Sequence, residues 1–304
     1  MKTWALLSFT ACGISLLLCG CGGGSKPAVV SPLAGNWLLV GPMPTNEISI
    51  PPAAPLPSGV RLAMTFDVAG DQVIAGGFAT NYCDNFGVGI EFGDVAAGIL
   101  AADGSFTATP ANSPLNTISI KGTAPEKSGE PWSGSYKVSL GLTAINTPAC
   151  DANFSGTFTA TSFPLVSGVY VGTGSTLAGT NGVSKAVPVT LQVTLQQGGI
   201  VTNPGNGAAS NYFSNTLLTG SIKVQGSPCF SSGVTQSTPP SSVFGNMVSA
   251  RFLMDDGSTL SLEGPLTDVT EGHISTGIIL VQGGNCGGPN PTSAFVVPGL
   301  DRQN

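Results

Sequence analysis

The segment RLAMTFDVAGDQV (61–73) decides the fold class of this chain. Its large apolar side chains, Leu62, Met64 and Phe66, occupy every second position, and the run ends at a glycine. Alternation of this kind is typical of a β-strand that buries one face, and glycine permits the turn that follows. The segment therefore predicts an antiparallel β-structure rather than a helical one.

The same pattern recurs in the second half of the chain, where TLQVTLQQGGIV (190–201) repeats the alternation and the glycine. Three further pairs of segments are similar and keep the same order. The Asp-Gly step in one pair suits a tight hairpin turn, because both central positions tolerate positive φ. The shared order predicts an internal duplication. The pairs are LAGNWLLVG (33–41) with VSGVYVGTG (166–174), ILAADGSFTAT (99–109) with FLMDDGSTLSL (252–262), and GSYKVSLGL (134–142) with STGIILVQG (275–283).

The composition supports an all-β protein with two domains. The 304 residues include 43 glycines and 23 prolines, which predict many turns, and only 9% are charged, which argues against disorder. No amphipathic helix of three turns is recognisable after residue 21. We expect two tandem antiparallel β domains at 33–164 and 165–299, followed by a tail at 300–304. The joining segment SFPLVSG (162–168) leaves almost no linker, so the domains should touch.

Small barrels are favoured over sandwiches for both domains. Gly35-Asn36-Trp37 resembles the Gly-x-Trp start of lipocalin-like barrels, in which the tryptophan closes one end, and Gly168-Val169-Tyr170 is a weaker copy. An immunoglobulin-type sandwich needs a tryptophan between paired cysteines, and the second half has none there. Trp132 lies beside EKSGEP, which predicts a loop.

The N-terminus has the features of an export signal. Lys2 precedes an apolar run from Trp4 to Leu18, which is too short for a comfortable membrane span. The run ends in Leu18-Cys19-Gly20-Cys21, which resembles the bacterial lipobox. That resemblance implies a signal peptide at 1–20, cleavage before Cys21 and acylation of Cys21. Cys19 is the alternative acceptor, although Leu18 is large for the position before the cleavage site. Residues 21–32 then form a flexible tether.

This resemblance implies a lipid-anchored protein of the bacterial cell envelope whose partner through the acyl chains is a membrane. Gly22 stands where an aspartate would favour the inner membrane, so we expect the outer membrane, with the domains in the periplasm or at the cell surface. The formal net charge is −6 and no Lys/Arg cluster is present. Nucleic-acid binding needs phosphate neutralisation and is therefore excluded.

Four cysteines remain after the signal peptide and the lipidated residue are set aside: Cys83, Cys150, Cys229 and Cys286. An even number in an oxidising compartment predicts disulfides, and four cysteines permit three pairings. The duplication selects Cys83–Cys150 and Cys229–Cys286, one bridge in each half. Each bridge is expected to stabilise the fold by about 3–4 kcal/mol.

The sequence contains few candidate catalytic residues. His273 is the only histidine, and a Ser-His-Asp triad would need it with Asp268 or Glu271. The G-x-S-x-G motif is absent, so we interpret His273 as a loop residue before a strand. The cysteines are better explained as disulfides than as zinc ligands. We therefore predict no catalytic residue, no metal site and no cofactor.

The carboxylates around CDNFGVGIEFGD (83–94) are the strongest candidate for a ligand site. Paired carboxylates can support glycoside hydrolysis, and the glycines beside Asp84, Glu91 and Asp94 permit close approach of a ligand. A carbohydrate-binding module or a glycoside-active enzyme that uses these three residues is therefore our alternative functional hypothesis. The alternative is an edge strand at 87–92 kept soluble by charge. Our leading hypothesis is a non-enzymatic binding or structural role, with a small apolar molecule, a glycan or an envelope protein as the partner.

Overall fold

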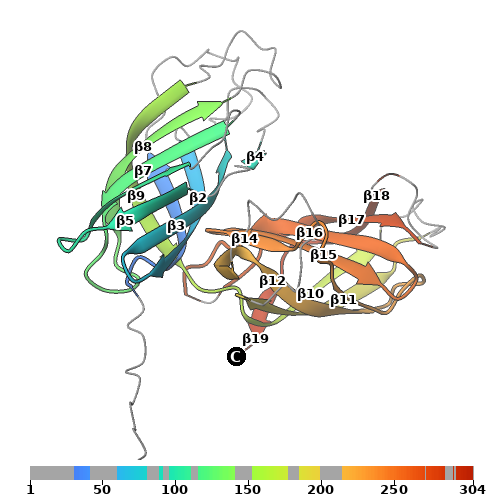
Figure 1. The fold of residues 1–304 in the computed structure, drawn as a ribbon. Coiled ribbons are helices and arrows are strands. Elements are labelled where there is room, and N and C mark those ends of the chain that lie inside the picture. Colours follow the sequence, from blue (N-terminus) through green and yellow to red (C-terminus); the bar gives the residue numbers. More distant parts are fainter. Residues whose placement is uncertain are drawn as a thin grey trace, which may run out of the picture. The chain divides into compact units, whose positions relative to one another are not determined.

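The computed structural model describes residues 31–41, 60–80, 89–91, 96–110, 116–140, 153–176, 185–198, 214–270, 272–284, 290 and 292–303. Within these ranges the secondary structure is almost entirely β, and the only helical element is the 3₁₀ turn η1 (Ser214–Thr216). The strands form two closed eight-stranded antiparallel barrels in tandem (Figure 1). The prediction of two small barrels without a long helix is therefore confirmed.

The first barrel is an up-and-down meander in which each strand pairs with the next and the last pairs with the first. A short extra strand, β4 (Gly89–Glu91), pairs with β3 beside this ring. Closure leaves the ring itself with no unpaired sheet edge. The ring consists of β1 (Gly35–Gly41), β2 (Val60–Ala69), β3 (Gln72–Thr80), β5 (Ala96–Leu100), β6 (Ser105–Pro110), β7 (Asn116–Thr123), β8 (Trp132–Leu140) and β9 (Asn153–Phe163).

The second barrel has the same meander order. Two short strands lie outside its ring: β14 (Ser242–Phe244) pairs with β15, and β19 (Asp301–Gln303) pairs with β10. The ring consists of β10 (Gly168–Thr176), β11 (Pro188–Gln197), β12 (Leu218–Gln225), β13 (Ser232–Thr235), β15 (Met247–Met254), β16 (Ser258–Pro265), β17 (Gly277–Gly283) and β18 (Thr292–Val297).

The pairing register of the first strand with the second is the same in the two barrels. Gly35 and Gly168 begin the two domains with φ of +132° and +136°, a region that L side chains rarely adopt, so glycine is required at both. The aromatic residue two positions later faces the interior in each case. This agreement supports the predicted duplication. The matched cross-strand pairs are Gly35–Phe66 with Gly168–Leu195, and Trp37–Met64 with Tyr170–Val193.

Two details differ from the sequence comparison. The Asp-Gly turn at 103–104 joins the fourth and fifth strands of its ring, whereas the turn at 256–257 joins the fifth and sixth. Residues 300–304 were expected to form a tail, but they contain β19. This strand pairs with Val169–Val171 of β10, beyond the part of β10 that pairs with β18. Leu300 is fully buried. The C-terminal segment therefore completes the wall of the second barrel.

Both interiors are filled by side chains. Trp132, which the sequence places in a loop, begins β8 and lies in the core of the first barrel at 5% exposure. The preceding segment EKSGEP is polar and predicts a loop. The start of β8 could not be predicted from it, because this start depends on burial of the Trp132 indole. Large side chains lie against glycines: a Cβ on Gly122 would come 2.6 Å from the Trp132 ring, and one on Gly134 would come 2.7 Å from Phe158. Alternation of large and small residues is how small barrels are packed.

The two ends of the first barrel are called the proximal end and the distal end, and each is defined by the strand termini and connections that it carries. The proximal end carries the start of β1, the end of β9, and the turns 70–71, 101–104 and 124–131. It is closed by Leu33, which is fully buried and whose carbonyl accepts a 2.8 Å hydrogen bond from Trp37 Nε1. At the distal end, the strand termini are joined by 42–59, 81–95, 111–115 and 141–152.

Candidate functional site

The predicted carboxylate patch is described only in part. Asp84 and Asp94 lie outside the described residues. Glu91 ends β4, with its backbone opposite Phe78 at the distal end of β3. Of the expected strand 87–92 the structure describes β4 (Gly89–Glu91), which pairs with β3. A carbohydrate site at these three residues stays a prediction.

Five aromatic rings form the centre of the first barrel. Trp132 makes edge-to-face contacts with each of the other four, at centroid distances of 5.0 to 5.9 Å. Its Nε1 is buried without a hydrogen-bond partner among the described residues. Burial also raises the pKa of the Tyr136 phenol in the same interior. The cluster is a packing centre made by Trp37, Phe66, Phe106, Trp132 and Phe158.

The connection 226–231 folds over one end of the second barrel. Phe230 is buried, and its ring lies 5.7 Å, edge to face, from that of Phe295 on β18. Cys229 packs against the same core. The Asp255 carboxylate accepts hydrogen bonds from the Ser231 backbone and hydroxyl, and these hold the pKa of Asp255 below its usual value. The turn at 255–257 therefore fixes this connection.

Cys229 is the one predicted disulfide cysteine within the described residues, where it packs against the core of the second barrel. Cys83, Cys150 and Cys286 lie outside them, so the pairing stays a prediction. The topology is informative nonetheless. In both barrels the first cysteine of each predicted pair belongs to the connection between the third and fourth strands, and the second to that between the seventh and eighth.

The most extensive polar cluster among the described residues joins the two barrels. Asn36 on β1 and Gln197 at the end of β11 form a reciprocal amide pair, with N···O distances of 2.9 and 2.8 Å. Asn36 Nδ2 also donates to the Pro164 carbonyl at 3.1 Å. Gln197 Nε2 donates to the Asn215 carbonyl at 2.7 Å, and Gln197 Oε1 accepts from Val166 N at 2.9 Å.

Thr65 extends this cluster toward β14. Its hydroxyl lies 3.0 Å from Asn36 Oδ1 and 3.3 Å from the Val243 carbonyl, and it accepts a 2.9 Å hydrogen bond from Gly245 N. Asn36, Thr65 and Gln197 are each at most 9% exposed. With Thr65 included, every donor and acceptor of both amides is used, which is the condition under which a buried polar network is stable. We call Asn36, Thr65, Gln197 and Gly245 the junction.

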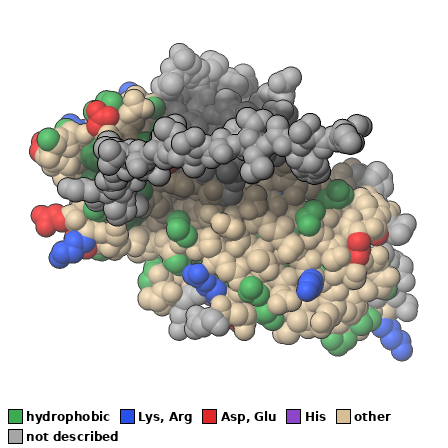
Figure 2. All heavy atoms as spheres, turned by 60° about the horizontal axis from the view of Figure 1, so that its bottom comes forward, with side chains coloured by type: hydrophobic (Ala, Val, Ile, Leu, Met, Phe, Trp, Pro, Cys, Tyr) green, Lys and Arg blue, Asp and Glu red, His purple; other side chains and the backbone are tan. Residues whose placement is uncertain are grey.

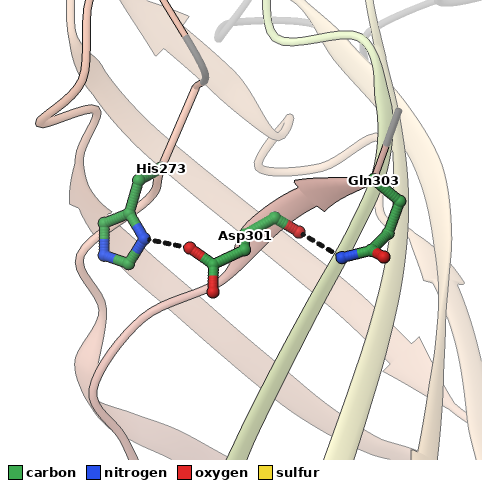
Figure 3. Close-up of polar contacts among 3 residues, drawn as sticks. All are labelled: His273, Asp301 and Gln303. Carbon is green, nitrogen blue, oxygen red and sulfur yellow. Dashed lines mark hydrogen bonds and ion pairs between the residues drawn. The ribbon is translucent and has the colours of Figure 1, made fainter.

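His273 lies outside any catalytic arrangement in the described residues. Its Nδ1 is 2.6 Å from Asp301 Oδ1, and Gln303 Nε2 donates to the Asp301 carbonyl (Figure 3). The expected orienter Asp268 instead accepts hydrogen bonds from Thr270. The Cε1–Nε2 edge lies against Gly299, where a triad would need its nucleophile. The pair connects the 266–276 segment to β19. Glu271 lies outside the described residues.

The comparisons with known proteins identify no relative. No family model, no curated protein and no solved structure matches the chain. No group of three or more His, Cys, Asp or Glu side chains that could hold a metal ion occurs within the described ranges. In the part of the chain that the structure describes, no helix is long and apolar enough to cross a membrane.

Proposed function

We propose that this chain is a lipid-anchored protein of the bacterial cell envelope with a non-enzymatic binding or structural role. The observation that carries the proposal is the sequence Leu18-Cys19-Gly20-Cys21 at the end of the apolar run. The direction of the chain through the first barrel is compatible with an anchor there. The chain enters β1 at the proximal end, just after the segment predicted as a tether. The connections 42–59, 81–95, 111–115 and 141–152 all join strands at the opposite, distal end. An anchor at Cys21 would therefore attach at one end of a rigid barrel and leave the other end available.

The packing of the barrels favours their ends and walls as the contact surfaces. Leu39, Met64 and Ile120 in the first barrel are fully buried, as are Leu191 and Leu260 in the second. A small apolar ligand would have to displace such side chains. Connections between strands on a rigid scaffold are common binding surfaces. We therefore place the binding role outside the described interiors.

Substituting Cys21 tests the anchor. Cys21→Ser should abolish incorporation of a labelled fatty acid and move the protein from the membrane fraction to the soluble fraction, because a hydroxyl cannot form the thioether. Cys19→Ser is the matched control and should keep both the label and the membrane fraction. Label retained on Cys21→Ser, or lost from Cys19→Ser, would place the anchor elsewhere.

The disulfide pairing is the second testable element of the proposal. Non-reducing peptide mapping should join Cys229 to Cys286 and Cys83 to Cys150. The position of Phe230 against β18 supports the first bridge, because Cys286 precedes that strand. In a ring of eight strands the two connections concerned lie opposite each other, so each bridge would cross one end of its barrel. A peptide joining Cys83 to Cys229 would contradict this arrangement.

A further inference from the structure

The outer wall of the first barrel over β6, β7, β8 and β9 has an unusual composition. Each exposed side chain described on these four strands is a hydroxyl or an amine, and none is a carboxylate or a large apolar group. We call this surface the hydroxyl wall. Its exposed residues are Thr107, Thr109, Lys121, Thr123, Ser133, Ser135, Lys137, Ser155, Thr157, Thr159 and Thr161.

The strand register arranges these groups in rows across the wall. In one row Lys121 lies between Thr107 and Ser135, and Thr157 follows on β9. In the next row Lys137 lies between two serines, at 119 and 155. The two lysines are diagonal neighbours on adjacent strands, so their backbones are about 7–8 Å apart. Both ammonium groups can therefore reach one anionic group, with hydroxyls on either side.

The charge of the wall is opposite to that of the protein, whose formal net charge is −6. Among the described residues, an ion pair joins Lys127 to Glu130 and a polar contact joins His273 to Asp301, and neither wall lysine takes part in such a contact. The nearest described carboxylates, Asp103, Glu126 and Glu130, belong to the turns 101–104 and 124–131 at the proximal end and not to the strands of the wall. Figure 2 shows how sparse charged groups are over the visible described surface, much of which is uncharged. Two unpaired lysines on a wall without carboxylates are thus a distinct positive surface.

We propose that the hydroxyl wall binds an anionic polysaccharide. Lysine ammonium groups pair with sulfate, phosphate or carboxylate groups, and serine and threonine hydroxyls both donate to and accept from sugar hydroxyls. The wall offers a row of such hydroxyls at the strand spacing of about 4.8 Å, which suits an extended polar chain. A lipid surface is disfavoured because the wall residues include no large apolar side chain to insert, and the exposed Ile99 and Val40 lie singly on the two flanking strands. This inference does not depend on the lipid anchor.

The experiment compares binding to immobilised dextran sulfate and to neutral dextran. The purified full chain should bind dextran sulfate in low salt and show no comparable binding to dextran. The double variant Lys121→Gln/Lys137→Gln should bind about tenfold or more weakly, with a smaller salt dependence, because fewer counterions are released from the polyanion. Glutamine is polar and only slightly shorter than lysine, and both positions are exposed, so the barrel should remain folded.

Lys185→Gln/Lys223→Gln is the matched control, since it removes the same charge from two exposed lysines of the second barrel. It should bind dextran sulfate within about twofold of the wild type. Equal weakening by both double variants would show a general charge effect and overturn the proposal. Absence of wild-type binding, equal binding to dextran, or stronger binding to anionic vesicles would also overturn it.

Discussion

Replacing Gly245 with alanine is expected to destabilise the protein by about 3–5 kcal/mol. Gly245 has φ of +54°, and an L residue in that region costs about 1–2 kcal/mol. A Cβ there would also overlap the Trp37 carbonyl and come 2.5 Å from Met64 N, both of which are backbone atoms of the first barrel. The clash would push β14 away from β1 and β2, and the Gly245 N–H to Thr65 hydrogen bond would be lost.

Gly257→Ala is the matched control for this substitution. Gly257 has φ of +82°, and no atom lies within 4 Å of the position that a Cβ would occupy there. The control should therefore cost only the backbone contribution of about 1–2 kcal/mol. Equal destabilisation by the two variants would show that the junction contact with the first barrel contributes nothing.

The position of the tryptophans provides the measurement. Trp37 and Trp132 belong to the first barrel, and the third tryptophan, Trp4, lies in the predicted signal peptide. Tryptophan fluorescence of the mature chain thus reports the first barrel, while far-UV circular dichroism reports both barrels. In urea the two signals should coincide for the wild type and separate for Gly245→Ala, because loss of coupling breaks two-state behaviour.

Much of the fold is readable from local patterns. Alternating apolar residues around Met64 and Val193 predict the second strand of each barrel, and the glycines before Trp37 and Tyr170 predict where each barrel begins. These signals are strong because barrel packing imposes a period of two and a positive φ at fixed positions. The Asp-Gly turns are local as well. An Asp-Gly step identifies a hairpin but not the place of that hairpin in the strand order. The sequence comparison therefore paired two turns that are not equivalent in the barrels.

The junction could not be predicted from the sequence, because its residues are far apart along the chain and carry no motif. Asn36 occupies the variable position of Gly-x-Trp, and its counterpart in the second barrel is Val169. A polar residue at an outward strand position normally indicates solvent. Only the second barrel's contact with that face, through Gln197 and Gly245, makes Asn36 a buried residue. The candidate carboxylates were predicted from their place in the glycine-rich segment 83–94, and the structure adds only the place of Glu91.

Asn36→Ala is expected to lower the free energy of unfolding by about 3–5 kcal/mol. The substitution removes both hydrogen bonds of the amide pair and leaves Gln197 Nε2 and Oε1 buried with one partner each. The Thr65 hydroxyl loses an acceptor as well. Buried groups left unsatisfied cost about 1–3 kcal/mol each, which is why the loss exceeds that of an ordinary hydrogen bond. Gln192→Ala, on the exposed face of the same strand as Gln197, should change stability by less than about 0.5 kcal/mol.

A double-mutant cycle separates this pair from its surroundings. Asn36→Ala and Gln197→Ala should each be strongly destabilising. The double variant should be destabilised by about 1–3 kcal/mol less than the sum of the two single effects. The reason is that the double variant has no buried amide that has lost its hydrogen-bond partner. Additive effects would mean that the two amides act independently and that their reciprocal hydrogen bonds contribute no coupling. Non-additivity would instead identify this amide pair as the contact through which folding of one barrel stabilises the other.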